Sequence, residues 1–196
     1  MKKGLVTIVI LAVVAVALFG WVKKTYNSLV TGDESVQSAW SQVENVYQRR
    51  ADLIPNLVAT VKGYAEHESS TLQAVMEARA KATQITVDAS DLSEEQIARY
   101  QAAQGELSQA LGRLLAVSEA YPDLKANENF RDLQTQLEGT ENRITVERQK
   151  YNATAQTYNT NLRIFPNNIV AGLFHFEKKG YFKASEGAET APRVEF

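Results

Sequence analysis

An uncharged apolar run near the N-terminus constrains the chain more than any other feature. Residues Gly4 to Val22 contain no Asp, Glu, Lys or Arg, and a helix of that length extends about 28 Å, close to the roughly 30 Å hydrocarbon core of a bilayer. Lysine pairs flank the run on both sides, and Trp21 stands where an interfacial aromatic residue is expected. The run therefore predicts a transmembrane anchor over residues 1–24.

A cleaved secretory signal is the alternative interpretation of this run. Residues 15–17 read Ala-Val-Ala, which resembles the small-residue pattern before a signal cleavage site. Apolar residues continue beyond such a cut as far as Val22, and no Cys could accept a lipoprotein anchor, so the transmembrane interpretation is preferred. The positive charge of the lysines and the α-amino group before the run is nearly matched by that of the lysines after it. The prediction places the N-terminus on the cytoplasmic side of the membrane.

Charge and composition beyond the run exclude several classes of protein. Four of the 21 Lys and Arg lie in the first 24 residues, whereas all 23 Asp and Glu lie beyond them, so the rest of the chain is acidic, which argues against a nucleic-acid partner. The absence of Cys excludes disulfides, Cys-type zinc sites and thiol catalysis. With 10 Gly and 4 Pro the chain is poor in turn formers, which favours an all-α fold.

Heptad-spaced residues predict a long amphipathic helix after a short polar stretch at residues 31–34. Its seam has one charged member, Arg50, and Pro55 is expected to kink the helix without ending it. The apolar members of the seam are Val36, Trp40, Val43, Tyr47, Ile54, Leu57, Val61 and Tyr64.

Start and stop signals divide the remaining chain into three more helices. Residues 66–68 interrupt the seam, and Ser-x-x-Gln at 70–73 offers a capping box for a second helix. A similar box at 93–96 opens a third helix, and Asn127 can cap a fourth that ends before Pro166. The prediction is an up-and-down four-helix bundle; three long helices are the alternative if the seam runs on unbroken.

The segment from Phe165 to Phe182 is the most aromatic part of the chain, and two placements stay open. It either folds back on the end of the bundle or lies in a bilayer surface with its lysines at the headgroups. The residues concerned are Ile169, Val170, Leu173, Phe174 and Phe176, with Lys178, Lys179 and Lys183. The chain thus divides into an anchor (1–24), a bundle with this segment (25–182) and a flexible tail (183–196).

No catalytic, cofactor-binding or metal-ligating residue is predicted. Glu66, His67 and Glu68 offer suitable ligand types for zinc, but the spacing fails, because the other histidine, His175, lies far along the chain. A nucleophile elbow, a glycine-rich phosphate loop and an apolar carboxylate pair are all lacking in the sequence. A solvated helix end is the preferred interpretation of the triplet, and the chain is not expected to be an enzyme.

Polar residues on the expected core stripes are interpreted as structural. Arg50 should pair with a carboxylate of a neighbouring helix or extend to solvent, in preference to forming a ligand site. Three Tyr-Asn pairs occur, Tyr26-Asn27, Tyr151-Asn152 and Tyr158-Asn159, and the last two lie one heptad apart on the same helix face. They should set register through hydrogen bonds inside the bundle; a contact surface for another protein is the alternative.

Several long strings of the sequence point to one known family. They are RRADLIPNLVATVKGYAEHE (49–68), AYPDLKANENFRDLQTQLEGTENRI (120–144), FPNNIVA (165–171) and the terminal PRVEF. Through them the chain resembles the LemA family of bacterial single-pass membrane proteins. The resemblance implies an anchor, a four-helix bundle and a place in the bacterial cell envelope, with no settled activity and no catalytic residues to carry over. It also implies a partner role beside membrane proteases or other envelope proteins.

The predicted function is that of a non-catalytic, membrane-anchored helical scaffold in the bacterial inner membrane. Its expected partners are the lipid bilayer, further copies of itself and an envelope protein such as a membrane protease, and not nucleic acid. Small residues in the anchor would allow copies to approach closely. The alternatives are a lipid-binding, membrane-remodelling protein and a metal-dependent enzyme built on residues 66–68.

Overall fold

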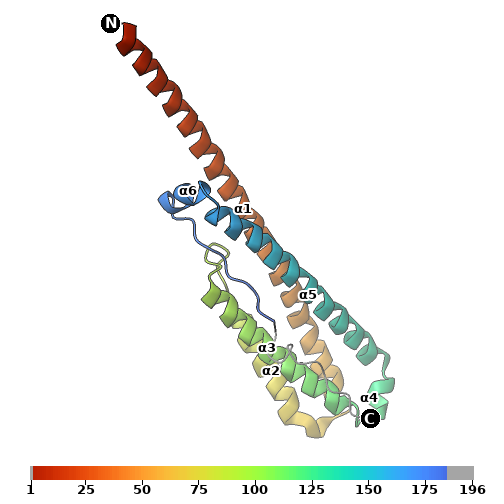
Figure 1. The fold of residues 1–196 in the computed structure, drawn as a ribbon. Helices are drawn as coiled ribbons and strands as arrows, with labels where there is room; N and C mark the ends of the chain where they lie inside the picture. Colours follow the sequence, from red (N-terminus) through yellow and green to blue (C-terminus); the bar gives the residue numbers. More distant parts are fainter. Residues whose placement is uncertain (1, 185–196) are drawn as a thin grey trace, which may run out of the picture.

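A computed structural model describes residues 2–184, with side chains from residue 4 onward. Seven helical elements make up this range, and no strand occurs in it, which confirms the all-α class (Figure 1). They are α1 (Lys2–Lys62), a 3₁₀ turn η1 (Glu66–Glu68), α2 (Ser69–Gln84), α3 (Glu94–Ser118), α4 (Pro122–Ala126), α5 (Glu128–Arg163) and α6 (Asn167–Leu173).

Helix α1 is a single continuous helix of 61 residues. Its N-terminal part projects from the body, and its C-terminal part packs within it (Figure 1). Residues 31–34, expected as a polar stretch ahead of the bundle, are helical, and Pro55 lies inside the helix without ending it. The predicted seam is buried from Val36 to Val61; Tyr64 is exposed, because α1 ends at Lys62.

Four long helices form the body as two pairs, α1 with α5 and α2 with α3 (Figure 1). The chain turns at residues 63–65, so the four-helix prediction is confirmed and the three-helix alternative is wrong. The short helix α4 was not expected; Pro122 lies in its first turn, where its missing N–H costs nothing, and Leu124 is buried beneath it.

The expected helix caps are only partly present. Asn127 caps α5 as predicted, its side-chain oxygen accepting from the backbone N–H of Phe130 at 3.0 Å. Ser93 occupies the N-cap of α3, but its side chain makes no capping bond. Ser70 lies inside the first turn of α2, because η1 leads the chain directly into that helix, so the capping box predicted there is wrong.

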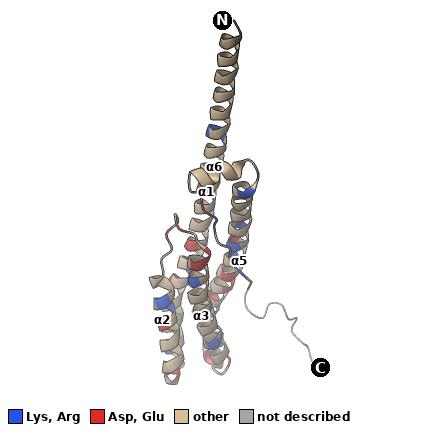
Figure 2. Cartoon of the chain, turned by 60° about the vertical axis from the view of Figure 1, so that its left-hand side comes forward, with Lys and Arg blue, Asp and Glu red and all other residues tan. Residues whose placement is uncertain are grey.

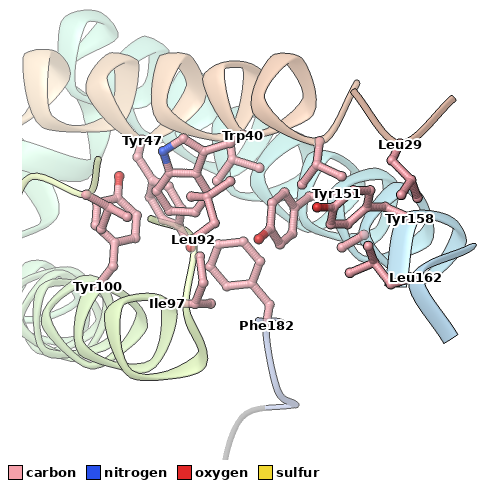
Figure 3. Close-up of a cluster of buried hydrophobic side chains, with 14 of the residues drawn as sticks. Leu29, Trp40, Tyr47, Leu92, Ile97, Tyr100, Tyr151, Tyr158, Leu162 and Phe182 are labelled. Atoms are coloured by element: carbon pink, nitrogen blue, oxygen red, sulfur yellow. The ribbon is translucent and has the colours of Figure 1, made fainter. Parts of the chain in front are cut away.

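Two clusters of buried side chains fill the body. The distal cluster, around Ile54 and Leu57, is mainly aliphatic and lies between all four long helices. The other cluster lies nearer the projecting part of α1 and is rich in aromatic rings (Figure 3). Its members include Trp40, Tyr151 and Phe182, and the last of these comes from the segment that follows α6. The aromatic cluster therefore depends on a part of the chain that is not helical.

Candidate functional site

The chain runs back along the body after α6, and its residues 179–183 form an extended strap between α3 and α5 (Figure 1). Three side-chain amides each bind both backbone groups of one strap residue, donating to its carbonyl oxygen and accepting from its N–H. The pairs are Asn159 with Lys179 (2.8 and 2.9 Å), Asn152 with Phe182 (both 2.9 Å) and Gln101 with Lys183 (2.9 and 3.0 Å). These amides replace the partner strand that an extended backbone needs when it is buried.

Gly180 is the point of closest approach between the strap and α3. Its N–H donates to the carbonyl oxygen of Leu92 at 2.7 Å, and its own carbonyl oxygen accepts from the Tyr151 hydroxyl at 3.1 Å. A Cβ at this position would lie 2.6 Å from the Cα of Glu94. Because backbone meets backbone here, only glycine fits without a shift of one of the two segments.

Phe182 anchors the strap in the aromatic cluster (Figure 3). Its ring stacks on Trp40 of α1 at a centroid distance of 5.8 Å and meets the edge of Tyr151 of α5 at 5.4 Å. The guanidinium carbon of Arg148 lies 4.8 Å from the same ring. The Phe182 side chain therefore contacts both α1 and α5. The backbone of the next residue, Lys183, is bound to Gln101 of α3.

The lysines of the aromatic segment do not lie together at one surface, and two of them form ion pairs with helices of the bundle. Lys179 is buried, and its Nζ lies 2.7 Å from Oδ1 of Asp33 on α1. Lys183 pairs with Glu94 on α3 at 2.8 Å. Lys178, the third of these lysines, is exposed. The contact with Asp33 also explains why α1 carries polar residues at 31–34.

The two Tyr-Asn pairs on α5 make the internal hydrogen bonds that the sequence predicted, whereas Tyr26 and Asn27 are exposed on α1. The partner of the two α5 pairs is the strap, however, and not a neighbouring helix. Burial raises the pKa of the Tyr151 and Tyr158 hydroxyls well above the usual range, and the Asp33 carboxylate adds to the rise at Tyr158. The ring of Tyr158 lies against Gly32 of α1, whose added Cβ would come within 3.1 Å of it.

Arg50 is paired as predicted. Its Nη1 lies 3.0 Å from Oε2 of Glu141 on α5 and donates to the Ser108 hydroxyl at 2.7 Å. Its Nη2 donates to the side-chain oxygen of Gln104 at 2.7 Å and to the backbone oxygen of the same residue at 3.1 Å. The Arg50 side chain is 2% exposed and that of Glu141 54% exposed. The guanidinium therefore joins α1, α3 and α5 and has no side open to a ligand.

The triplet at residues 66–68 forms the 3₁₀ turn η1 at the distal end of the body. Glu66 and His67 are exposed, and Glu68 accepts a hydrogen bond from the Tyr121 hydroxyl at 3.0 Å. His175 lies at the opposite end, directly after α6 (Figure 1). Within residues 2–184 no group of three or more His, Asp or Glu side chains is placed to hold a metal ion.

The end of the body from which the N-terminal part of α1 projects is formed by α6 against α1 (Figure 1). Tyr26 of α1 meets the rings of Phe174 and Phe176 at centroid distances of 4.8 and 5.6 Å. Val170 and Ala171 are buried on the bundle. Phe165, Ile169 and Leu173, in contrast, are 76%, 56% and 68% exposed. The aromatic segment thus folds back on the bundle with one face and leaves another apolar face open.

The N-terminal part of α1 has the properties predicted for the anchor. Among the described residues α1 is the one helix long and apolar enough to cross a membrane, and none of its most apolar window is buried in the body. The tail expected at 183–196 lies outside the described residues from 185 onward, while Lys183 itself is bound to α3.

Comparison with known proteins gives the family. The LemA family model matches residues 39–196, which include the bundle, α6 and the strap. The chain belongs to the LemA family. It is 30% identical to magnetosome protein MamQ 2 of Paramagnetospirillum magneticum over 95% of this chain and 74% of that protein. It is 26% identical to protein LemA of Metamycoplasma hominis over 82% of this chain and 69% of that protein.

The strap lies within the residues that the LemA family model matches. LemA membership and the exposed apolar part of α1 together indicate a membrane-associated protein. The sequence did not predict the strap as a structural element. The signal that could have indicated it is the heptad spacing of Asn152 and Asn159, whose amides bind it.

Proposed function

We propose that this protein is a non-catalytic, single-pass scaffold of the bacterial cell envelope, whose helical body binds a second copy or an envelope protein at the membrane surface. One observation carries the proposal: α1 passes without interruption from its exposed apolar part into the core of the body. Trp21 and Val22 are already partly covered by the core, and Leu29 is fully buried. No linker separates the anchor from the body.

Contacts just below the anchor hold α1 rigidly to the rest of the body. Asp33 binds the buried Lys179 of the strap, and Gly32 lies against the ring of Tyr158 on α5. The body is therefore held at a fixed height and orientation relative to the bilayer. A scaffold needs this property, because its partner must meet the same surface at the same depth each time.

The buried polar groups support a non-catalytic role. The two buried cations of the described residues, Arg50 and Lys179, are both engaged by structural partners on neighbouring elements. Catalytic groups, in contrast, are usually held in a cleft that substrate can enter. The magnetosome name of the MamQ relatives and the family membership favour a membrane-associated role in bacteria.

The proposed location is the bacterial inner membrane, with the N-terminus inside. The preferred partner is a second copy, because the anchor carries small residues that allow close helix approach. These residues are Gly4, Ala12, Ala15, Ala17 and Gly20. An envelope protein such as a membrane protease is the other candidate partner.

The test is a crosslink in bacterial cells on the full chain, followed by purification in detergent. We expect the protein in the membrane fraction after alkaline extraction, and a crosslinked species larger than the monomer. A variant with Val13→Arg and Val16→Arg should leave the membrane, whereas Val13→Leu with Val16→Leu should remain. A soluble full chain, or monomer alone with no crosslinked partner, would contradict the proposal.

A further inference from the structure

An apolar face of α6 is left open at the end of the body from which α1 projects. Ile169 and Leu173 lie one turn apart on α6, opposite the buried Val170 and Ala171, and Phe165 stands one turn earlier in the chain. Three large apolar side chains more than half exposed on so short a segment are unusual for a surface in contact with water.

This face lies at the depth where the anchor leaves the bilayer. The apolar run ends at Val22, and Tyr26, which meets Phe174 of the same segment, lies about 6 Å further along the helix axis. The headgroup layer on each side of a bilayer is about 5–8 Å thick. With the apolar run of α1 in the hydrocarbon core, α6 therefore lies within or directly against the headgroups.

The charge around the face suits a lipid surface. Residues 164–173 contain no acidic or basic residue, and α6 crosses α1 as an uncharged element in Figure 2. Lys23 and Lys24 are exposed on α1 on the N-terminal side of α6, and Arg163 is exposed at the end of α5. An apolar face bordered by cations is the usual composition of a segment that lies in an anionic bilayer interface.

The available space favours lipid over protein as the occupant. Tyr26, whose ring contacts Phe174, lies only about 6 Å along α1 from the end of the apolar run, which is less than the roughly 10 Å diameter of one helix. A partner helix therefore does not fit between α6 and the bilayer.

We infer that Phe165, Ile169 and Leu173 lie in the bilayer interface and give the body a second contact with lipid beside the anchor. The inference rests on the proposed function, because it requires α1 to span the membrane. It assigns the exposed part of the aromatic segment to lipid and its buried part, with the strap, to the bundle. Because the body is joined rigidly to α1, a second contact with lipid also restricts the tilt of both relative to the bilayer.

The test uses single cysteines in the full chain, which has no native Cys. Leu173→Cys and Ile169→Cys are labelled with an environment-sensitive fluorophore and reconstituted in vesicles of phosphatidylcholine and phosphatidylglycerol. Val146→Cys, on the exposed side of α5 about 26 Å below its end, is the matched aqueous control. Val14→Cys, in the apolar run, is the lipid control.

We expect lipids that carry a quencher on the acyl chain to quench the labels at Leu173 and Ile169 several-fold more than the label at Val146. Iodide in the water phase should show the reverse order. Both cysteines replace exposed side chains, so their melting temperatures should match the wild type, and the two sites check one another.

Four results would overturn the inference or its basis. Free iodide quenching at both α6 sites would show that the face is in water. Protection from both quenchers would show that a protein covers it. If Val14 is quenched by lipid but the α6 sites are not, the lipid contact is wrong while the anchor stands; if Val14 itself escapes lipid quenching, the proposed function fails as well.

Discussion

The side-chain amide of Asn159 binds both backbone groups of Lys179, donating to the carbonyl oxygen at 2.8 Å and accepting from the N–H at 2.9 Å. A β-strand neighbour would make the same two bonds, but here a helix side chain supplies them. Asn152 does the same for Phe182 one heptad earlier on α5, and Gln101 binds Lys183 from α3. The strap thereby connects the α1–α5 pair to α3.

Removal of the Asn159 amide should release the strap. Asn159→Ala leaves two buried backbone groups of Lys179 without partners, and we expect a loss of about 3 kcal/mol in the free energy of unfolding. Gln156→Ala, at an exposed position of the same helix, is the control and should change stability by less than about 0.5 kcal/mol. Denaturant unfolding measures both, and unchanged stability of Asn159→Ala would show that the clamp contributes little.

Hydrogen exchange gives an independent measure of the same clamp. The backbone amides of Lys179 and Phe182 should exchange slowly in the wild type, because both are hydrogen-bonded to side chains of α5. In Asn159→Ala the Lys179 amide should lose its protection first. Equal protection in both proteins would contradict the role assigned to Asn159.

Gly180→Ala should destabilise the protein, because the new Cβ would lie 2.6 Å from the Cα of Glu94. We expect a loss of about 2 kcal/mol or more, since backbone and not a flexible side chain must move. Gly112→Ala is the matched control: it lies on α3 with open space around its Cβ, and it should gain about 0.5–1 kcal/mol from helix propensity. Two variants of equal stability would show that the strap is not close-packed on α3.

Arg50→Ala should cost about 3 kcal/mol in the free energy of unfolding. The variant does not leave a buried, uncompensated carboxylate, because the Glu141 side chain is 54% exposed. The cost comes from the cavity and from the side-chain oxygen of Gln104, which loses its 2.7 Å hydrogen bond. Arg50→Met fills part of the space and should cost less, about 2 kcal/mol.

Glu141→Gln is the control for this interpretation. It removes the charge of the exposed partner and should cost about 1 kcal/mol or less. Thermal unfolding in detergent compares the three variants under identical conditions. Equal melting temperatures for Arg50→Ala and the wild type would show that the guanidinium does not stabilise the fold. If Glu141→Gln loses as much stability as Arg50→Ala, the stabilisation comes from the ion pair instead.

The sequence predicted those parts of the molecule that follow a periodic pattern. The heptad seam predicted the buried residues of α1 from Val36 to Val61, and Arg50, the charged exception in that seam, was expected to be paired. The strap has no such period, because its backbone is bound by side chains that lie far away in the sequence. The partners of Lys179 and Lys183 could not be predicted for the same reason: Asp33 and Glu94 lie on other helices.

Alkaline pH should destabilise the protein through its buried tyrosines. Burial raises the pKa of Tyr100, Tyr151 and Tyr158 well above the usual range, because the phenolate would be poorly solvated inside the body. In the unfolded chain these hydroxyls lose their protons near pH 10, where the folded protein still holds them. The unfolded state then binds fewer protons than the folded state, so stability falls as pH rises above about 10 and is fully present below it.

Urea unfolding at a series of pH values between about pH 9 and pH 11 measures this loss of stability. Tyr100→Phe removes one of the three hydroxyls and keeps the ring that packs on Trp40 and Tyr47. Its stability should therefore fall less steeply with pH than that of the wild type. Identical slopes for the two proteins would show that the Tyr100 hydroxyl does not contribute to the loss of stability at high pH.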